Sequence, residues 1–406
     1  MRDVAVVGIG MTRFGKFMAK SIKDLVRESV QGALADATIG PGDIQAAYVG
    51  NAAAGLMTGQ EMIRGQVTLS PLGIEGIPIV NVENACASSS SAFHLAWLGV
   101  ASGLYDCVLA VGFEKLYHDD KAKSFQALSA AIDVEAGSTF LKDFAAKKGL
   151  DMDILQQGSG MRRSIFMDMY SYYARPYMER YGLTQEHFAR ISVKNHKHGA
   201  HNPHAQYQKE VTLEEVLNSG DIVFPLTRMM CAPIGDGAAA CVLCSREKAA
   251  RYTTKPVWVA ASVMASGRLS AEEDAVTGDL APKAYERAGV DPRDIDVVEV
   301  HDATSPSEII GLIQLGLCRP EDAAAWIDDG SFEVGGRMPT NTSGGLECKG
   351  HPVGATGIGQ IYEIVEQLQG RAGRRQVEAP RVGMTHNGGG ILGVDAASMT
   401  LHVFKR

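Results

Sequence analysis

Apolar residues fall into short continuous runs separated by amphipathic segments, and this alternation predicts strands and helices in turn. The runs at 3–8, 107–111 and 236–244 are predominantly apolar, as in strands that are buried on both faces. Residues 22–37 instead place apolar side chains every three or four positions, which predicts a helix with one buried face. Strands that alternate with helices are typical of an α/β protein.

Two segments of the chain resemble each other. Residues 40–51 read Gly-Pro-Gly-Asp-Ile-Gln-Ala-Ala-Tyr-Val-Gly-Asn, and residues 290–301 read Val-Asp-Pro-Arg-Asp-Ile-Asp-Val-Val-Glu-Val-His. Each follows a predicted helix and leads into an apolar strand, a loop and a helix start made of small residues. Cys86 stands at one of these helix starts and His351 at the other. The repeated order predicts a duplicated α/β architecture with mostly parallel inner strands.

Residues 113–204 break this pattern, because they are polar, rich in Met and Tyr, and helical in character. We interpret them as an inserted loop domain that walls a ligand site. The predicted N-terminal half therefore comprises residues 1–112 and 205–250, and the predicted C-terminal half comprises residues 251–406.

The amino-acid composition argues against some classes of binding partner and favours one type of cellular compartment. The 406 residues carry a formal net charge of −8 and no basic stripe, which argues against nucleic acid as a partner. Seven cysteines, an odd number, favour a reducing compartment, and we expect the cytoplasm. No apolar run approaches the roughly 20 residues of a membrane span. The first residues are typical of a strand rather than of a signal peptide.

Two other motifs favour ordinary structural roles. Gly8-Ile-Gly10 follows a strand, but the spacing of the next glycine does not fit a dinucleotide-binding turn. The histidines between 196 and 204 have mixed spacings around an Asn-Pro turn, so we expect a solvated loop and no metal site there. The residues of the latter group are His196, His198, His201 and His204.

Cys86 lies in Asn84-Ala-Cys-Ala-Ser-Ser-Ser-Ser-Ala92, between a predicted strand and a predicted helix. The positive end of a helix dipole favours a thiolate, so we expect Cys86 to have a depressed pKa. The small neighbours leave room for a bulky thioester. A buried structural cysteine fits this segment equally well when it is taken alone.

Three histidines follow strands or precede a helix in the second half of the chain. His301 follows the strand at 297–300, His351 precedes a helix, and His386 follows the strand at 381–384. Imidazoles at such positions can activate a thiolate, donate a hydrogen bond to a thioester oxygen, or move the proton of a carbon acid.

Taken together, these motifs resemble those of the thiolase superfamily nearly from end to end. Asn84-Ala-Cys-Ala-Ser-Ser resembles the nucleophile motif, Asp236-Gly-Ala-Ala-Ala a mid-chain signature, and Lys349-Gly-His-Pro-Val-Gly-Ala-Thr-Gly357 the catalytic histidine motif. The chain is similar to the sterol-carrier-protein and archaeal-type branches. That closer likeness lies in residues 181–189 and 194–198, in His301-Asp302-Ala303 and in His386-Asn387.

The resemblance implies a five-layered α-β-α-β-α thiolase fold with duplicated βαβαβ halves and a helical loop-domain insertion. It also implies the site. Cys86 would accept the acyl group, and His351 would deprotonate the Cys86 thiol. His301 and His351 would hold a thioester oxygen. The loop that presents backbone N–H groups comprises Asn387, Gly388, Gly389 and Gly390.

The chain departs from the family at the second catalytic thiol. His386 stands where many thiolases have that cysteine, and Ala303 stands where sterol-carrier-protein thiolases have theirs. We therefore expect His386 to move the proton of the α-carbon, with His301 as the rival candidate. We expect Cys348 to be only packed.

The resemblance implies an acyltransferase that cleaves a 3-oxoacyl-CoA with coenzyme A, or runs the reverse Claisen condensation. Coenzyme A is then a substrate, and no tightly bound cofactor is expected. A homodimer is implied, and so is a zinc-ribbon/OB-fold accessory protein, as in acetoacetyl-CoA and benzoylsuccinyl-CoA thiolase complexes. Two alternatives are a retro-aldolase that acts on a hydroxyacyl-CoA and a non-catalytic CoA- or lipid-binding subunit.

Overall fold

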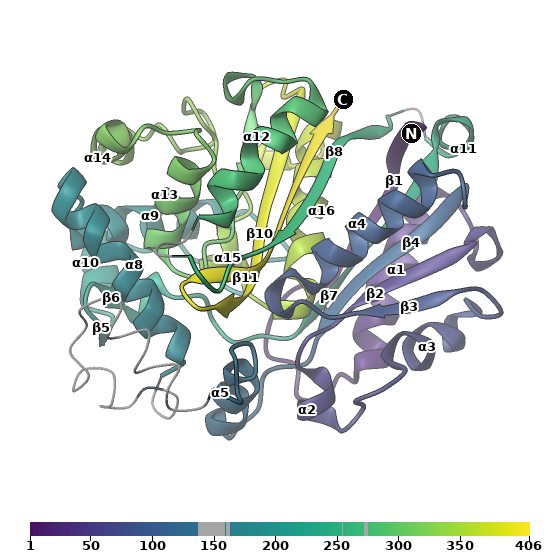
Figure 1. Ribbon diagram of the computed structural model, residues 1–406, viewed down its shortest axis with the longest axis horizontal. Helices are drawn as coiled ribbons and strands as arrows, with labels where there is room; N and C mark the ends of the chain where they lie inside the picture. Colours follow the sequence, from purple (N-terminus) through teal and green to yellow (C-terminus); the bar gives the residue numbers. More distant parts are fainter. Residues whose placement is uncertain (137–158, 160–162, 254, 272–274) are drawn as a thin grey trace.

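The computed structural model describes residues 1–136, 159, 163–253, 255–271 and 275–406, and one mixed sheet dominates it. Nine strands form the sheet in the order β3-β2-β4-β7-β1-β8-β11-β10-β9 (Figure 1). Their bounds are β1 Val4–Met11, β2 Ala46–Gly50, β3 Ile79–Val82, β4 Cys107–Glu114, β7 Gly237–Ser245, β8 Val257–Ser266, β9 Val297–Glu299, β10 Val382–Leu392 and β11 Asp395–Lys405. A separate pair comprises β5 (Asp221–Val223) and β6 (Leu226–Thr227).

The sheet consists of two parts that meet along one short ladder. Strands β1 and β8 pair only through Ala5 with Trp258 and Val6 with Val257. Among neighbouring strands of this sheet, β2–β3, β2–β4 and β9–β10 pair parallel, and the other pairs are antiparallel. The prediction of mostly parallel inner strands is therefore wrong. One reason is that β10 and β11 are joined by a tight turn at Gly393-Val394, and such a turn forces antiparallel pairing.

Helices complete five layers around these two parts (Figure 1). Helices α4 and α16 pack between the two parts of the sheet, α1 covers the outer face of the first part, and α12 covers that of the second. The five α-β-α-β-α layers expected from the resemblance are present. The helices named here are α1 (Ile22–Ala37), α4 (Ser88–Ala101), α12 (Val276–Ala288) and α16 (Thr356–Gln369).

The repeated segments form equivalent elements in the two halves. Each has a helix that ends in a left-handed residue, Thr38 or Gly289, followed by a 3₁₀ turn and a strand. In the first half the helix is α1, whose N-terminus is closed by a reciprocal Ser21–Asp24 capping box. The duplication predicted from sequence is thus present in the described chain.

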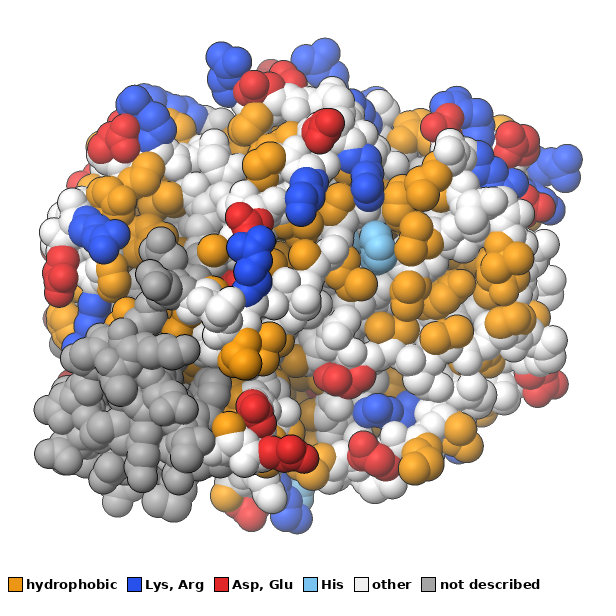
Figure 2. All heavy atoms as spheres, viewed as in Figure 1, with side chains coloured by type: hydrophobic (Ala, Val, Ile, Leu, Met, Phe, Trp, Pro, Cys, Tyr) orange, Lys and Arg blue, Asp and Glu red, His pale blue; other side chains and the backbone are white. Residues whose placement is uncertain are grey.

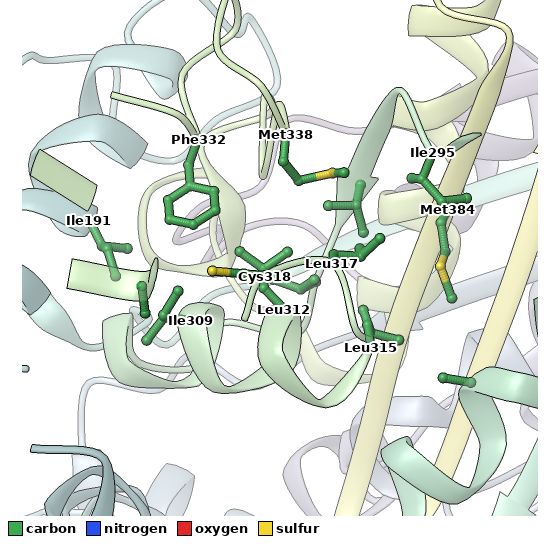
Figure 3. Close-up of a cluster of buried hydrophobic side chains, with 14 of the residues drawn as sticks. Ile191, Ile295, Ile309, Leu312, Leu315, Leu317, Cys318, Phe332, Met338 and Met384 are labelled. Carbon is green, nitrogen blue, oxygen red and sulfur yellow. The ribbon is translucent and has the colours of Figure 1, made fainter. Parts of the chain in front are cut away.

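A hydrophobic cluster fixes the second half around α13 (Ser305–Gln314). Ile309 and Leu312 of this helix belong to one buried cluster with Ile191, Phe332 and Met384 (Figure 3). Helix α13 begins shortly after His301, so this packing holds the chain that carries the histidine.

Further helices complete the described part of the chain. They are α2 (Ala54–Thr58), α3 (Arg64–Leu69), α5 (Lys121–Ser129), α8 (Ile165–Tyr181), α9 (Gln185–Gly199), α10 (Leu213–Leu217), α11 (Arg246–Tyr252), α14 (Ala323–Asp328) and α15 (Gly345–Lys349). Among them, α10, α14 and α15 pack on α9. The division into 1–112 with 205–250, 113–204 and 251–406 stays a prediction, and part of the inserted segment lies outside the described residues.

The histidines predicted to form a solvated loop do not all do so. His196 and His198 lie in the last turn of α9 and are buried, with exposed fractions of 4% and 3%. The Asn-Pro turn that suggested a loop comes only after the helix has ended. The loop prediction is therefore wrong for these two residues.

The surface carries mixed charges. On the face drawn in Figure 2, acidic and basic side chains are interspersed, and neither sign forms a continuous field. Within the described part of the chain, no helix combines the length and the apolar character that crossing a membrane requires.

Candidate active site

The turn after β3 presents the candidate nucleophile. Cys86 is the middle residue of a 3₁₀ turn, Ala85–Ala87, which runs directly into α4. The turn forms where Ala85 adopts a positive φ of 48°. The Cys86 side chain is half-buried and lines a cavity of about 920 Å³.

The corresponding turn of the second half presents His351. It follows α15 and Gly350, and a 3₁₀ turn at Val353–Ala355 then runs into α16. His351 is 9% exposed and lines the same cavity. The two turns therefore face one space from opposite halves.

Cys86, His301 and His351 converge as the sequence predicts. The Cys86 sulfur and ring nitrogens of the two histidines all lie within 4.8 Å of one another. The two imidazole rings stand edge to face, with centroids 5.1 Å apart. This is the spacing from which a substrate atom can contact all three groups.

Hydrogen bonds assign the tautomer of His351. The Thr356 hydroxyl donates to the Pro352 carbonyl at 3.2 Å, so it accepts from His351 Nδ1–H at 2.7 Å. Nε2 of His351 then keeps its lone pair. An imidazole in this state is a base.

His301 has the opposite tautomer, with its proton on Nε2. The Asn387 side-chain amide donates to His301 Nδ1 at 3.0 Å, so His301 carries its proton on Nε2. The Asn387 carbonyl oxygen accepts from the Ser90 hydroxyl of α4 at 2.7 Å. Asn387 thus links the nucleophile helix to His301, which becomes a hydrogen-bond donor.

His386 lies within strand β10 rather than after its end, as the sequence predicted, and it lines the same cavity, but both of its ring nitrogens are already bonded. Nδ1 accepts from the backbone N–H of His301 at 3.3 Å, and Nε2 lies 3.1 Å from the Thr277 hydroxyl of α12. Because Nδ1 accepts, Nε2 carries the proton and donates to Thr277. The ring supports His301 from behind.

Gly388, Gly389 and Gly390, predicted to form a loop with Asn387, instead lie inside strand β10, and this part of the strand touches the nucleophile turn. A Cβ atom on Gly389 would meet the Asn84 carbonyl oxygen at 2.1 Å, so only glycine allows this approach. The backbone N–H groups of Cys86 and Gly390 lie close enough to the Cys86 sulfur to lower the pKa of the thiol. These N–H groups are suitable donors for an oxyanion.

Burial decides the charge of the resting site. Burial, and then the nearby Glu114, raise the pKa of Cys86 to about 12, more than the N–H groups lower it. Burial also lowers the pKa of His301 to about 4 and that of His386 to about 3, and it lowers the pKa of His351 well below its usual value. The predicted depressed pKa of Cys86 is therefore wrong for the resting protein, in which thiol and imidazoles are neutral.

Three supporting residues were missed by sequence reasoning. Thr356 belongs to the motif around His351, so its position gave a usable signal. Thr277 and Glu114 lie far from any motif, and no local pattern marks them. Cys348, expected to be only packed, is buried with its sulfur 3.1 Å from the Tyr207 carbonyl oxygen.

A thiol and two imidazoles are also donors that zinc accepts, and among the described residues Cys86, His301 and His351 are the group close enough to bind a metal. A ligating nitrogen must present a lone pair, however. His301 presents an N–H to the cavity because Asn387 occupies its other nitrogen. The arrangement suits acid–base chemistry better than a metal.

Comparison with known proteins agrees with this geometry. The family model "Thiolase, N-terminal domain" matches residues 4–224, and "Thiolase C-terminal domain-like" matches residues 264–402. The acetyl-CoA acetyltransferase of Methanothermobacter thermautotrophicus is 40% identical over the full length of both chains. Human sterol carrier protein 2 is 37% identical over 95% of this chain and 70% of its own length.

Solved structures show the same fold. An Ltp2-ChsH2(DUF35) aldolase structure matches with a TM-score of 0.78 at 25% identity, covering 98% of this chain and 97% of its own. Human mitochondrial 3-ketoacyl-CoA thiolase matches with a TM-score of 0.70 at 16% identity, covering 100% of this chain and 98% of its own. The chain is therefore an enzyme of the thiolase family.

Proposed function

We propose that the enzyme cleaves a 3-oxoacyl-CoA with coenzyme A, or runs the reverse Claisen condensation, through an acyl group carried on Cys86. The observation that carries the proposal is the meeting of the Cys86 thiol with His301 and His351, within 4.8 Å, on the wall of a large cavity. Relatives named acetyl-CoA acetyltransferase, 40% and 37% identical, support it. Coenzyme A is a substrate here, and no tightly bound cofactor is required.

In the first step His351 takes the Cys86 proton while the sulfur attacks the 3-oxo carbon. This order suits a thiol of raised pKa, because the thiolate need form only as the new bond forms. The 3-oxo oxygen becomes an oxyanion. The donors available to it are His301 Nε2–H and the backbone N–H groups of Cys86 and Gly390.

The bond to the α-carbon then breaks, and that carbon must gain a proton. His351 already holds the proton that it took from Cys86, so its return to the α-carbon balances the step without a second thiol. His386, the candidate from sequence, would first have to release Thr277. We therefore propose His351 as the donor, with His386 as the alternative that variants separate.

Coenzyme A completes the cycle. His351 takes the proton of the incoming thiol, the thiolate attacks the acyl-enzyme, and Cys86 leaves and regains the proton. The same donors serve the second oxyanion.

The test is an incubation with acetoacetyl-CoA in the absence of coenzyme A, followed by intact-protein and peptide mass spectrometry. We expect one acetyl group on Cys86, removed when coenzyme A is added, and no adduct in Cys86→Ala. Cleavage by Cys86→Ala at the wild-type rate would overturn the proposal.

A second candidate is retro-aldol cleavage of a 3-hydroxyacyl-CoA, favoured by the likeness to the Ltp2-ChsH2(DUF35) aldolase. That reaction turns the 3-hydroxy carbon into a free aldehyde or ketone, so no acyl group stays on cysteine. Release of a carbonyl product from a 3-hydroxyacyl-CoA, unchanged in Cys86→Ala, would identify this activity.

We also propose a homodimer. Strand β3 is the edge of the sheet, and its Val80 is 42% exposed. Hydrophobic side chains gather over the side of the molecule where β3 and α4 lie (Figures 1 and 2). An exposed apolar edge strand is a ready pairing site. Light scattering should give twice the chain mass, and Val80→Lys should lower it.

A zinc-ribbon/OB-fold accessory protein is proposed as a further partner. The likeness to the Ltp2-ChsH2(DUF35) aldolase supports it, because the name of that protein includes a DUF35 component. Full activity of the purified chain alone would argue against it. We also propose a cytoplasmic location, because an odd number of cysteines in the sequence favours a reducing compartment.

A further inference from the structure

One wall of the cavity holds a carboxyl group that the proposed chemistry does not use. Glu347 belongs to α15, four residues before His351, and it is 1% exposed. It lines the same cavity as Cys86, together with Cys231 and Ala303. Ala303 comes two residues after His301, and its carbonyl oxygen accepts from the backbone N–H of Ala232, the residue after Cys231. Glu347 is thus part of the substrate cavity.

Among the described residues, no group gives Glu347 a well-formed hydrogen bond. Neither carboxyl oxygen has a partner. The Ser192 and Ser305 hydroxyls lie beside it and lower its pKa, but one donates its proton to the other at 3.0 Å, which leaves at most one hydroxyl proton for the two carboxyl oxygens. Buried polar groups are almost always satisfied, and leaving one unsatisfied costs stability. The missing partner is therefore expected to arrive from the cavity.

The neighbouring carboxyl groups each have a hydrogen-bond or ion-pair partner within the protein, whereas both oxygens of Glu347 lack one. Asp302 accepts from the backbone N–H of Leu346 at 2.8 Å. Glu308 accepts from Asn341 at 2.8 Å and pairs with Lys194 at 2.8 Å. These bonds leave both groups fixed behind the cavity wall.

Charge limits what the partner can be. Asp302, Glu308 and Glu347 stand together, and Lys194 pairs with Glu308. Burial, and then Glu308, raise the pKa of Glu347 to about 8, although Ser192, Ser305 and Lys194 lower it. At Glu347 an anion would meet the acidic neighbours Asp302 and Glu308, whereas a neutral N–H or O–H group would find an acceptor.

We propose that Glu347 is a specificity-determining residue that binds a neutral N–H or O–H group of the thioester substrate and selects against a substrate with a negative charge at that place. This inference rests on the proposed function. The donor can be an amide N–H of the pantetheine arm or a hydroxyl on the acyl chain, and both present the same chemistry to the carboxyl group.

The test compares Glu347→Leu and Glu347→Gln in the full-length enzyme. The substrates are acetoacetyl-CoA, acetoacetyl-S-propane, which lacks the pantetheine amides, and two 3-oxoacyl-CoA chains that differ only by one hydroxyl. For the substrate that supplies the donor, Glu347→Leu should lower kcat/KM by about tenfold to a hundredfold. Glu347→Gln keeps donors and an acceptor, so it should lose less.

The substrate pattern identifies the donor. A loss with acetoacetyl-CoA that disappears with acetoacetyl-S-propane assigns the pantetheine amide. A loss confined to the hydroxylated chain assigns the acyl hydroxyl. Wild-type kcat/KM for Glu347→Leu with every substrate overturns the proposal.

Stability separates binding from structure. Removing an unsatisfied buried carboxyl should leave the Tm unchanged or raise it. The matched control is Glu363→Gln, whose carboxylate is satisfied by Asn202 at 2.8 Å and Arg375 at 2.7 Å, and which should lower the Tm. A fall in the Tm for both Glu347 variants would mark a structural role and overturn the proposal.

Failure of the proposed function is distinguishable. Wild-type protein that neither cleaves acetoacetyl-CoA nor becomes acylated would refute thiolysis alone. Calorimetric binding of the same four thioesters to Cys86→Ala, with and without Glu347→Leu, would still test Glu347. Weaker binding of the donor-bearing substrates supports the inference, and equal binding overturns it.

Discussion

The turn after β3 and the turn before α16 have the same backbone plan. Each contains a 3₁₀ turn that runs into a helix of 14 residues in the middle layer, with Cys86 inside its turn and His351 just before the turn at Val353–Ala355. They differ in the side chain presented and in its support. Cys86 receives backbone N–H groups close to its sulfur, whereas His351 is oriented by the side chain of Thr356. One turn is built to stabilise negative charge, and the other to hold a lone pair.

This difference indicates a division of labour between duplicated halves. The first half contributes the nucleophile, and the second contributes the base and the donor His301. A scaffold with pseudo-symmetry can thus place two unlike groups at one point, and single residues then decide which group each half supplies.

Removing the nucleophile is the most severe test of the proposed division of roles between the two halves. Cys86→Ala should lower thiolysis of acetoacetyl-CoA by more than about 10⁴-fold, because the covalent intermediate cannot form. Steady-state assays measure the rate, and binding of coenzyme A should persist. An activity within tenfold of wild type would show that the first half does not supply the nucleophile.

The charge of the nucleophile turn gives a second test. Because burial raises the pKa of Cys86 to about 12, the thiolate fraction, and with it alkylation by iodoacetamide, should rise about tenfold per pH unit from pH 7 to 10. Peptide mass spectrometry would give the rate at Cys86, with the urea-unfolded chain as the control. A rate that levels off below pH 8 would mean that the thiolate is already formed.

Removing the base from the other turn should have a smaller effect. His351→Ala should lower kcat by about a hundredfold to a thousandfold, within the range for loss of a general base. Acylation of Cys86 and deuterium exchange at the α-carbon should both fail if one imidazole serves both steps. Thr356→Val, which frees the His351 ring, is the graded control. Exchange that survives in His351→Ala would assign the α-proton to another group.

His386→Ala should have the smallest effect, about tenfold in kcat, because the ring supports the backbone of His301 rather than moving protons. Thr277→Val, which removes the other partner of His386, is its control. A loss of about 10²–10⁴-fold with Cys86 acylation intact would instead confirm the acid–base role that the sequence predicts for His386.

The order of elements was predictable from the sequence because the repeat carries it. The same motif spacing identified Cys86, His301 and His351, which converge in the structure. The bonds between them were not predictable. Asn387 meets Ser90 across 297 positions of the chain, and no local pattern records which way an amide points.

The predicted direction of the Cys86 pKa shift was wrong for a related reason. A helix start is visible in a sequence, but the depth of burial around it is not. Here burial and Glu114, which comes from the end of another strand, outweigh the favourable N–H groups. Burial and contacts with distant parts of the chain, rather than the local position at a helix start, determine the charge of Cys86.

The closeness of the two middle helices has a consequence for how this enzyme can evolve. A Cβ atom on Gly357, at the start of α16, would meet the backbone nitrogen of Ser90 at 2.6 Å. Glycine at position 357 therefore allows the close approach of α4 and α16 that determines the distance between the Cys86 sulfur and the His351 imidazole. A misplacement of about 1 Å can cost about a hundredfold in rate. Substitutions at Gly357 are thus expected to lower the catalytic rate, although this residue does not line the substrate cavity.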